Sequence, residues 1–163
     1  MKYLVTGSAG LIGSQLVHDL EKSGETVYSC YNNIKPVNGI PTKLNLLNLE
    51  DVSKIFKKIQ PDVVIHSAAL TDVEKCEVEP KLANSINVKS TEIITKEVEN
   101  FDSYLMYIST DYVFDGKKGS YKETDLTNPL NQYGKTKLSG EKIIEQKSSK
   151  WSVIRTSTPF SAY

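Results

Sequence analysis

Residues 2–13, with the sequence KYLVTGSAGLIG, decide the fold of this chain. The first five letters form a short, largely apolar run typical of a buried β-strand, and a helical periodicity starts within the last three. Between them, Gly7 allows a sharp turn, Gly10 lets backbone N–H groups approach a pyrophosphate, and Gly13 lets the helix pack closely on the sheet. The stretch therefore predicts a strand–turn–helix unit that can hold a dinucleotide.

The spacing of these glycines is G-x-x-G-x-x-G, which differs from the G-x-G-x-x-G of simple dinucleotide-binding folds. A glycine-rich turn without a ligand is the alternative interpretation. The position of the turn favours cofactor binding, because the strand-to-helix junction is where such a motif must lie.

Outward from this stretch, short apolar runs alternate with helical runs along the chain. The predicted strands are 2–6, 25–31, 43–47, 62–66, 103–109 and 151–155, and the predicted helices are 11–22, 49–60, 80–100 and 131–146. Alternating β and α units with apolar strands predict a parallel sheet with helices on both faces, joined by right-handed crossovers. This is the α/β doubly wound sheet of a Rossmann fold, expected as one domain over residues 1–163.

The composition excludes several classes of function. The 163 residues hold 20 basic and 20 acidic side chains, so the net charge of zero gives no electrostatic footprint for nucleic acid or an anionic membrane. No apolar run reaches the ~18 residues of a membrane span. Cys30 and Cys76 are too few for a disulfide framework and lack metal-ligand spacing. We therefore expect a cytoplasmic protein with no nucleic-acid partner, no membrane partner and no metal.

A second candidate for chemistry is the pair Tyr133 and Lys137 in the helical run 131–146. Residues four apart share a helix face, with Cβ atoms about 6 Å apart. A free tyrosine has a pKa of about 10 and is a poor acid–base group at neutral pH. A neighbouring ammonium and a cationic nicotinamide would favour the phenolate, so we expect a lowered pKa for Tyr133. The alternative is an accidental pair on a helix surface.

A third candidate is Ser109-Thr110-Asp111 at the end of the fifth strand. Ligands of open α/β sheets lie outside the carboxyl ends of the strands, so these side chains face the expected crevice. Either hydroxyl could bind a substrate oxygen whose charge changes during hydride transfer. The alternative is a purely structural cap. The order of glycine turn, strand-end hydroxyl and Tyr-x-x-x-Lys favours chemistry more strongly than any of the three alone.

Four segments in order resemble the extended short-chain dehydrogenase/reductases, and within them the dTDP-4-dehydrorhamnose reductase family. They are VTGSAGLIG (5–13), HSAALTDVEKCE (66–77), ISTDYVFDG (108–116) and NPLNQYGKTK (128–137). The similarity extends over essentially the whole chain, and the last two segments are the specific ones.

The resemblance implies reduction of the 4-keto group of a dTDP-deoxysugar by an NAD(P)-dependent oxidoreductase. Tyr133 would be the proton donor, Lys137 would hold Tyr133 and the nicotinamide ribose, and Thr110 would bind the reacting oxygen, with Asp111 beside the substrate. Asn87 matches a family position near the end of the fourth strand. The residues implied in cofactor binding are Gly7, Gly10, Leu11, Ile12, Gly13, Asn45, Leu46, Ala69, Leu70, Thr71, Tyr133 and Lys137.

The segment Cys30–Asn33 bears on the choice between NADP and NAD. NAD-specific enzymes tend to place an acid on the ribose 2′-OH about 20 residues past the glycines, and this segment has none. With Lys35 nearby, NADP is slightly favoured over NAD. Asn45 stands where the family usually has an aspartate near the adenine, and both side chains accept hydrogen bonds.

Three other kinds of protein are weighed against the reductase. Sugar-nucleotide dehydratases typically carry Asp-Glu after the threonine, whereas Asp111 is followed here by Tyr112. Hexose 4-epimerases usually show a segment ending in V-Y-G where this chain has Val113-Phe114-Asp115-Gly116. A non-catalytic dinucleotide-binding protein like the regulatory subunit of methionine adenosyltransferase stays open, because folds of this kind are reused without chemistry.

Other polar residues are predicted to be structural. His66 ends the fourth strand, but Tyr133 already supplies an acid, and His18 lies on the polar side of the first helix. Cys76 lies in an acidic stretch that should raise its thiol pKa, which predicts a weak nucleophile. The acidic residues between 111 and 125 are expected to form a solvated surface and not a metal site.

Members of the family generally continue beyond a strand such as 151–155 into a substrate-binding lobe. The resemblance therefore implies that this C-terminal lobe is absent, and that the chain is a fragment or a naturally shortened member. Such a chain would hold a dinucleotide but leave the nucleotide-sugar site unroofed. The identity of the sugar and the oligomeric state stay open, with a homodimer as one candidate.

Overall fold

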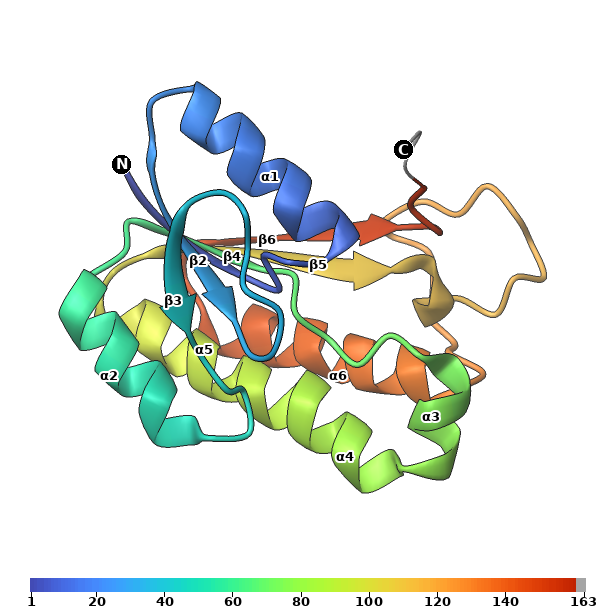
Figure 1. Cartoon of the computed structure of the whole chain (residues 1–163). Helices are drawn as coiled ribbons and strands as arrows, with labels where there is room; N and C mark the ends of the chain where they lie inside the picture. Colours follow the sequence, from blue (N-terminus) through green and yellow to red (C-terminus); the bar gives the residue numbers. More distant parts are fainter. Residues whose placement is uncertain (161–163) are drawn as a thin grey trace.

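The computed structural model describes residues 1–160, and its six strands form one parallel sheet in the order β3-β2-β1-β4-β5-β6 (Figure 1). The strands are β1 (Lys2–Thr6), β2 (Thr26–Tyr31), β3 (Ile40–Lys43), β4 (Val63–His66), β5 (Tyr104–Thr110) and β6 (Trp151–Thr156). β1 pairs with both β2 and β4, so the order of strands reverses there. This topology confirms the doubly wound α/β prediction and puts the expected ligand crevice at the carboxyl ends of β1 and β4.

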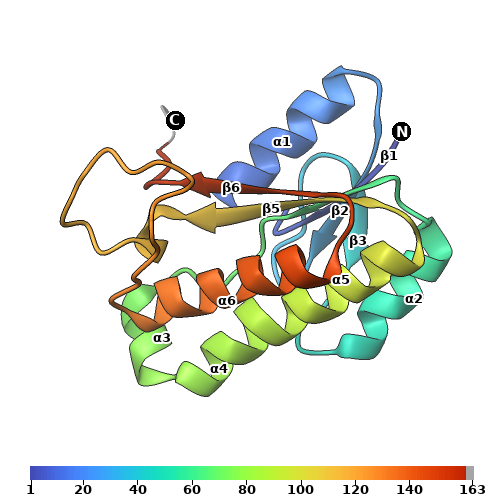
Figure 2. The same cartoon turned by 180° about the vertical axis from the view of Figure 1, so that it is seen from behind.

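Helices cover the two faces of the sheet unequally (Figures 1 and 2). On one face α1 (Leu11–Lys22) packs on β1 and β2. The opposite face carries α2 (Leu49–Ile59), α5 (Ser90–Asn100) and α6 (Gln132–Lys147). The short helices α3 (Val73–Val78) and α4 (Pro80–Asn84) pack against each other and against α6.

One apolar cluster on each face holds the helices to the sheet. Under α1, Val17 packs with Val5 of β1 and Ile65 of β4. On the opposite face, Phe56 of α2 and Ile94 of α5 are fully buried in a larger cluster. Each fully buried large apolar side chain contributes roughly 1.5–3 kcal/mol to folding, so these clusters fix the strand ends that bear the site.

The third strand lies earlier than the sequence predicts. The prediction places it at 43–47, whereas β3 ends at Lys43. Beyond that residue the side chain of Asn45 accepts a hydrogen bond from the backbone N–H of Leu47 at 2.9 Å. This local turn takes the chain out of the sheet, so the apolar letters after Lys43 do not extend the strand.

The predicted helix at 80–100 is present but not uniform. α4 and α5 are joined by a π-helical turn, η1 (Ser85–Lys89), and α3 is an additional helix that the sequence did not predict. The Asp72 side chain caps α3 by accepting from the N–H of Lys75 at 2.9 Å. A π-helical turn holds one residue more than an α-helical turn. The side chain of the buried Asn87, at the centre of this turn, therefore leaves the helix in a different direction than it would from a regular α-helix.

The long segment after β5 folds largely on itself. It begins with a 3₁₀ turn, η2 (Asp111–Val113), and Phe114 then stacks on Tyr121 with ring centroids 4.3 Å apart. The Tyr121 hydroxyl donates to Asp115 at 2.5 Å, and this hydrogen bond is the main reason that the pKa of Asp115 is lowered to about 2. The remaining predicted elements agree with the structure to within one residue. Within residues 1–160, no helix has the length and apolar character needed to cross a membrane.

Candidate active site

The glycine turn between β1 and α1 is tightly enclosed. Gly7 has a φ of +68°, and a Cβ there would lie 2.8 Å from the backbone nitrogen of Ala68. A Cβ at Gly13 would lie 2.2 Å from the carbonyl oxygen of Gly7. Gly10 donates its N–H to that same oxygen at 2.9 Å and precedes the first residue of α1. Side chains would fill this cradle, so glycine keeps the backbone within reach of a ligand.

This turn forms one wall of an open pocket of about 700 Å³, a volume typical of cofactor sites. The sequence-predicted site residues that line it are Gly7, Gly10, Leu11, Ile12, Gly13, Leu46, Ala69, Thr71, Thr110, Asp111, Tyr133 and Lys137. The segment Cys30–Ile34, at the carboxyl end of β2, also lines the pocket. The structure therefore brings these residues from six separate parts of the chain to one crevice.

Two predicted cofactor residues, Asn45 and Leu70, are not part of the pocket lining. The Asn45 side chain forms the turn that follows β3. Leu70 is held by its backbone, since its N–H donates to Oδ1 of Asn87 at 2.7 Å and its carbonyl accepts from Nδ2 at 3.1 Å. The residues next to them in the chain do line the pocket. The sequence therefore predicted the correct segments, but not which side chains of each segment face the pocket.

Asn87 ties two walls of the pocket together. Its Nδ2 also donates to the hydroxyl of Thr136 at 3.0 Å, and that hydroxyl donates to the carbonyl of Tyr133 at 2.8 Å. The loop after β4 is thereby fixed to the first turn of α6. We call these hydrogen bonds from Asn87 to Leu70 and Thr136 the clamp. The family resemblance placed Asn87 near the end of β4 but did not indicate the clamp, because the clamp joins segments that are distant in the sequence.

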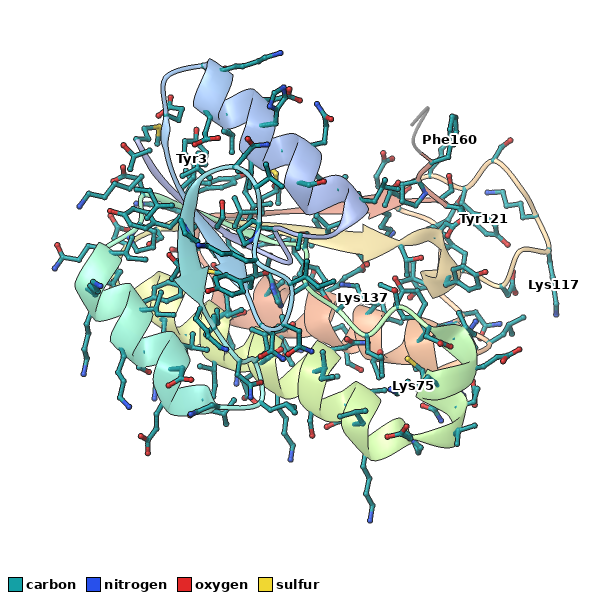
Figure 3. The ribbon with its side chains drawn as sticks, in the orientation of Figure 1. Tyr3, Lys75, Lys117, Tyr121, Lys137 and Phe160 are labelled. Carbon is teal, nitrogen blue, oxygen red and sulfur yellow. The ribbon has the colours of Figure 1, made fainter. Side chains whose placement is uncertain are left out.

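Thr110, Tyr133 and Lys137 lie where the end of β5 meets the start of α6. Thr110 is the last residue of β5. α6 begins after Asn131, whose side chain accepts from the N–H of Gly134 at 2.7 Å. This cap places Tyr133 in the first helical turn and Lys137 one turn later on the same face. In Figure 3, Lys137 lies between the sheet and α6.

Burial shifts the pKa of both members of the Tyr133–Lys137 pair. It raises the pKa of Tyr133, with the hydroxyl of Thr110 acting in the opposite direction and Asp111 adding to the rise. It lowers the pKa of Lys137 to about 7. For the residues of this chain alone, the pKa of Tyr133 moves opposite to the predicted direction, because desolvation outweighs the hydrogen bond with Thr110. The part of the prediction that rests on a cationic nicotinamide stays a prediction. A raised pKa keeps the phenol protonated, which is the form that a proton donor needs.

Ser109 lines the pocket, but its hydroxyl is already engaged by a buried carboxylate. It donates to the carboxylate of Glu141, which lies one helical turn beyond Lys137 and is buried. Arg155 of β6 donates to the same carboxylate, with Nη2 at 2.7 Å and Nε at 3.1 Å. The Thr110 hydroxyl is held more weakly, donating to Asp111 and accepting from the N–H of Tyr112, each at 3.2 Å, so of the two hydroxyls it is the one that can turn to a ligand.

His66 is a structural residue in the middle of a hydrogen-bond chain. The Thr91 hydroxyl donates to the carbonyl of Asn87 at 2.8 Å, so it accepts from Nε2 of His66 at 3.0 Å. Nδ1 then accepts from the hydroxyl of Thr6 at 2.8 Å. Burial, aided by the charge of Lys137, lowers the pKa of His66 to about 3 and keeps the ring neutral. The structural assignment of this histidine agrees with the sequence prediction.

Cys76 and the acidic residues have no arrangement that favours separate chemistry. The Cys76 thiol donates to the carbonyl of Leu70 at 3.4 Å, and burial, together with Asp72 and Glu77, raises its pKa. This direction agrees with the predicted rise of the thiol pKa. In the part of the chain that the structure describes, no group of three His, Cys, Asp or Glu residues gathers as a metal site.

The whole chain matches a known protein family. A family model described as the RmlD substrate binding domain matches residues 1–163. The chain belongs to that family. The resemblance to dTDP-4-dehydrorhamnose reductases, found in the four sequence segments, is thereby confirmed over the whole chain.

Two kinds of curated relative match the chain. A dTDP-4-dehydrorhamnose reductase of Aggregatibacter actinomycetemcomitans is 34% identical over 163 residues, which are 99% of this chain and 53% of the relative. Methionine adenosyltransferase 2 subunit beta of Xenopus tropicalis is 35% identical over 153 residues, which are 93% of this chain and 45% of the relative. The chain thus spans about half the length of the curated relatives that it matches.

A solved structure shows the same fold with a cofactor bound. The dTDP-4-dehydrorhamnose reductase of Bacillus anthracis, in complex with NADP, is 30% identical and superposes with a TM-score of 0.85. The match covers 96% of this chain and 53% of that one. The sheet and helices of this chain are therefore those of an NADP-binding reductase structure.

Proposed function

We propose that this chain is the cofactor-binding part of a cytoplasmic oxidoreductase that uses NADPH or NADH to reduce the 4-keto group of a dTDP-deoxysugar. One observation carries the proposal: the glycine turn after β1 and the trio Thr110, Tyr133 and Lys137 line the same pocket. A carbonyl reductase must bring its hydride source and its proton donor to the same substrate carbonyl. The cofactor-binding turn and the proton donor must therefore face one pocket.

The pocket residues fit a dinucleotide. The cradle at Gly7 and Gly13, which a Cβ would fill, suits a pyrophosphate held by backbone N–H groups. Asn32 and Asn33 line the pocket at the carboxyl end of β2, where the adenosine ribose would lie. Neither carries a charge that would repel a 2′-phosphate, which favours NADP slightly over NAD. The NADP complex of the Bacillus anthracis reductase supports the same choice.

The side chains of the pocket can complete the reduction of a carbonyl. When bound in this pocket, a reduced nicotinamide would supply the hydride for the carbonyl carbon. Tyr133, kept protonated by its buried position, donates its phenolic proton to the carbonyl oxygen. Thr110 offers its hydroxyl to the same oxygen, with Asp111 on the substrate side. Lys137 binds the ribose hydroxyls and stabilises the phenolate that the proton transfer leaves.

The substitution Tyr133→Phe tests this proposal. It removes the transferred proton and keeps the ring, so we expect turnover of dTDP-4-dehydrorhamnose with NADPH to fall by about 100-fold or more. The affinity for NADPH, measured by isothermal titration calorimetry, should stay within about twofold, because the phenol is not the main cofactor contact.

Tyr112→Phe is the matched control for that substitution. The Tyr112 ring packs edge-on against Tyr133, with centroids 5.8 Å apart, and has no assigned role in proton transfer. It should keep turnover near the unsubstituted level. Unchanged turnover in Tyr133→Phe would remove the assignment of Tyr133 as the acid.

A second candidate is a non-catalytic dinucleotide-binding subunit. The observation that favours it is the 35% identity to methionine adenosyltransferase 2 subunit beta over 93% of the chain. Both functions require cofactor binding, but only the reductase then transfers the hydride. Co-elution with a methionine adenosyltransferase catalytic subunit, together with NADPH binding and no turnover, would support the regulatory role. Turnover of the keto-sugar would support the reductase.

A further inference from the structure

Lys137 has an unusual environment for a buried cation. The residue is only 2% exposed, yet it takes part in none of the ion pairs formed within residues 1–160. Its Nζ lies instead over the ring of Tyr107, 3.9 Å from the ring centroid. This distance is well inside the range of about 6 Å in which an aromatic face attracts a cation.

Tyr107 is fixed from two sides at the centre of β5. Its ring packs against His66 of β4, with centroids 5.5 Å apart, and the residue is fully buried. Its hydroxyl lies against α6 at Gly140, where a Cβ would be 2.5 Å from the phenolic oxygen. Among the described residues that hydroxyl makes no hydrogen bond with Lys137, so the ring is the part of Tyr107 in contact with the ammonium.

Ionisable groups approach Lys137 from each neighbouring element. His66 of β4 is neutral, because burial lowers its pKa to about 3. Tyr133 of α6 is an uncharged phenol at neutral pH, because burial raises its pKa. Glu141 of α6 favours the ammonium, but its carboxylate is already paired with Arg155 of β6. The Tyr107 ring is therefore the group in direct contact that offsets the desolvation of this ammonium.

We propose that Tyr107 is a positioning residue whose ring holds the ammonium of Lys137 at the pocket wall. The inference rests on the proposed function, in which Lys137 binds the ribose and stabilises Tyr133. An ammonium has three N–H donors, and a carboxylate partner would occupy one or more of them. An aromatic face attracts the charge through its quadrupole and leaves the donors free for the ribose hydroxyls and Tyr133.

The first test removes the aromatic face at position 107. Tyr107→Phe keeps the ring and should leave the titration midpoint of Lys137 unchanged. Tyr107→Leu replaces the ring by an aliphatic side chain and should lower that midpoint by about one pH unit. The midpoint is followed by NMR on the Cε signals of ¹³C-lysine-labelled protein, with the signal of Lys137 assigned by its loss in Lys137→Arg. Equal midpoints in Tyr107→Leu and the unsubstituted protein would overturn the inference.

A fluorinated series keeps the test decisive even where Tyr107→Leu does not fold. Phenylalanine at position 107 is replaced by its mono-, di- and trifluorinated forms, which keep nearly the same shape and weaken the negative ring face stepwise. The Lys137 midpoint should fall along the series, and a constant midpoint would overturn the inference. The titration needs neither cofactor nor turnover. A ring-dependent midpoint in a protein that binds no NADPH would therefore overturn the proposed function alone.

Discussion

Gly13 is a residue at which a single methyl group would collide with the backbone of the glycine turn that forms one wall of the pocket. A glycine in a helix ordinarily gains up to about 1 kcal/mol when it is replaced by alanine. Here the new Cβ would lie 2.2 Å from the Gly7 carbonyl oxygen and 3.0 Å from the Ser8 Cα, which are backbone atoms that cannot rotate away. We expect Gly13→Ala to lower the free energy of unfolding by about 1–3 kcal/mol and to weaken NADPH binding at least about tenfold.

Urea unfolding and calorimetric titration with NADPH measure these two effects. Ser14→Ala is the control, because it also puts an alanine into the first turn of the same helix, at an exposed position where a Cβ is already present. It should leave both quantities nearly unchanged. A Gly13→Ala protein with full stability and full NADPH affinity would show that the turn has more room than the structure gives it.

The catalytic candidates were predictable from the sequence, whereas the aromatic contact that supports Lys137 was not. Tyr133 and Lys137 are four apart on one helix, so a local rule brings their side chains together. Thr110 follows from the rule that ligands lie at the carboxyl ends of strands. Tyr107 reaches Lys137 only through the packing of α6 on β5, which no local spacing records, whereas Glu141 lies four residues from Lys137 on the same helix.

At the scale of elements, the π-helical turn η1 controls how the pocket walls meet. Asn87, at its centre, makes three side-chain hydrogen bonds, two to the backbone of Leu70 and one to Thr136. At about 1 kcal/mol for each buried bond, Asn87→Ala should lower the free energy of unfolding by about 2–4 kcal/mol. It should also weaken NADPH binding, since the loop after β4 loses its tie to α6.

The matched control is Asn84→Ala, at an exposed position in the adjoining helix α4. Urea unfolding should give it nearly unchanged stability, and calorimetry should give it unchanged NADPH affinity. Equal losses in both variants would mean that the effect comes from changing any asparagine of this helical segment and not from the hydrogen bonds of Asn87.

Elements with a long periodic pattern were predictable to within one residue, as α1 and α6 show. The errors lie where short polar contacts decide the backbone. Asn45 ends β3 early through its turn with Leu47, and Asp72 starts the unpredicted helix α3 as its cap. Such contacts compete with regular structure over one or two residues, and an apolar pattern does not encode them.

The whole molecule buries two ionisable groups whose pKa values both fall on folding, His66 to about 3 and Lys137 to about 7. His66 is protonated at about pH 6.5 when unfolded, whereas the folded protein keeps it neutral until about pH 3. The unfolded state therefore binds more protons between those values, and stability falls with decreasing pH by up to about 1.4 kcal/mol per pH unit. The same reasoning for Lys137 gives a stability that rises from about pH 7 to about pH 10.5.

His66→Gln separates the acid part of this dependence, because glutamine can still accept from Thr6 and donate to Thr91 without gaining a charge. Urea unfolding at intervals from pH 6.5 to pH 4.5 should show a slope reduced by about 1 kcal/mol per pH unit relative to the unsubstituted protein. His18→Gln, on the outer helix α1, should keep the full slope. If His66→Gln also kept it, the acid sensitivity of the fold would have to come from carboxylates such as Asp115, whose pKa is lowered to about 2 by its hydrogen bond from Tyr121.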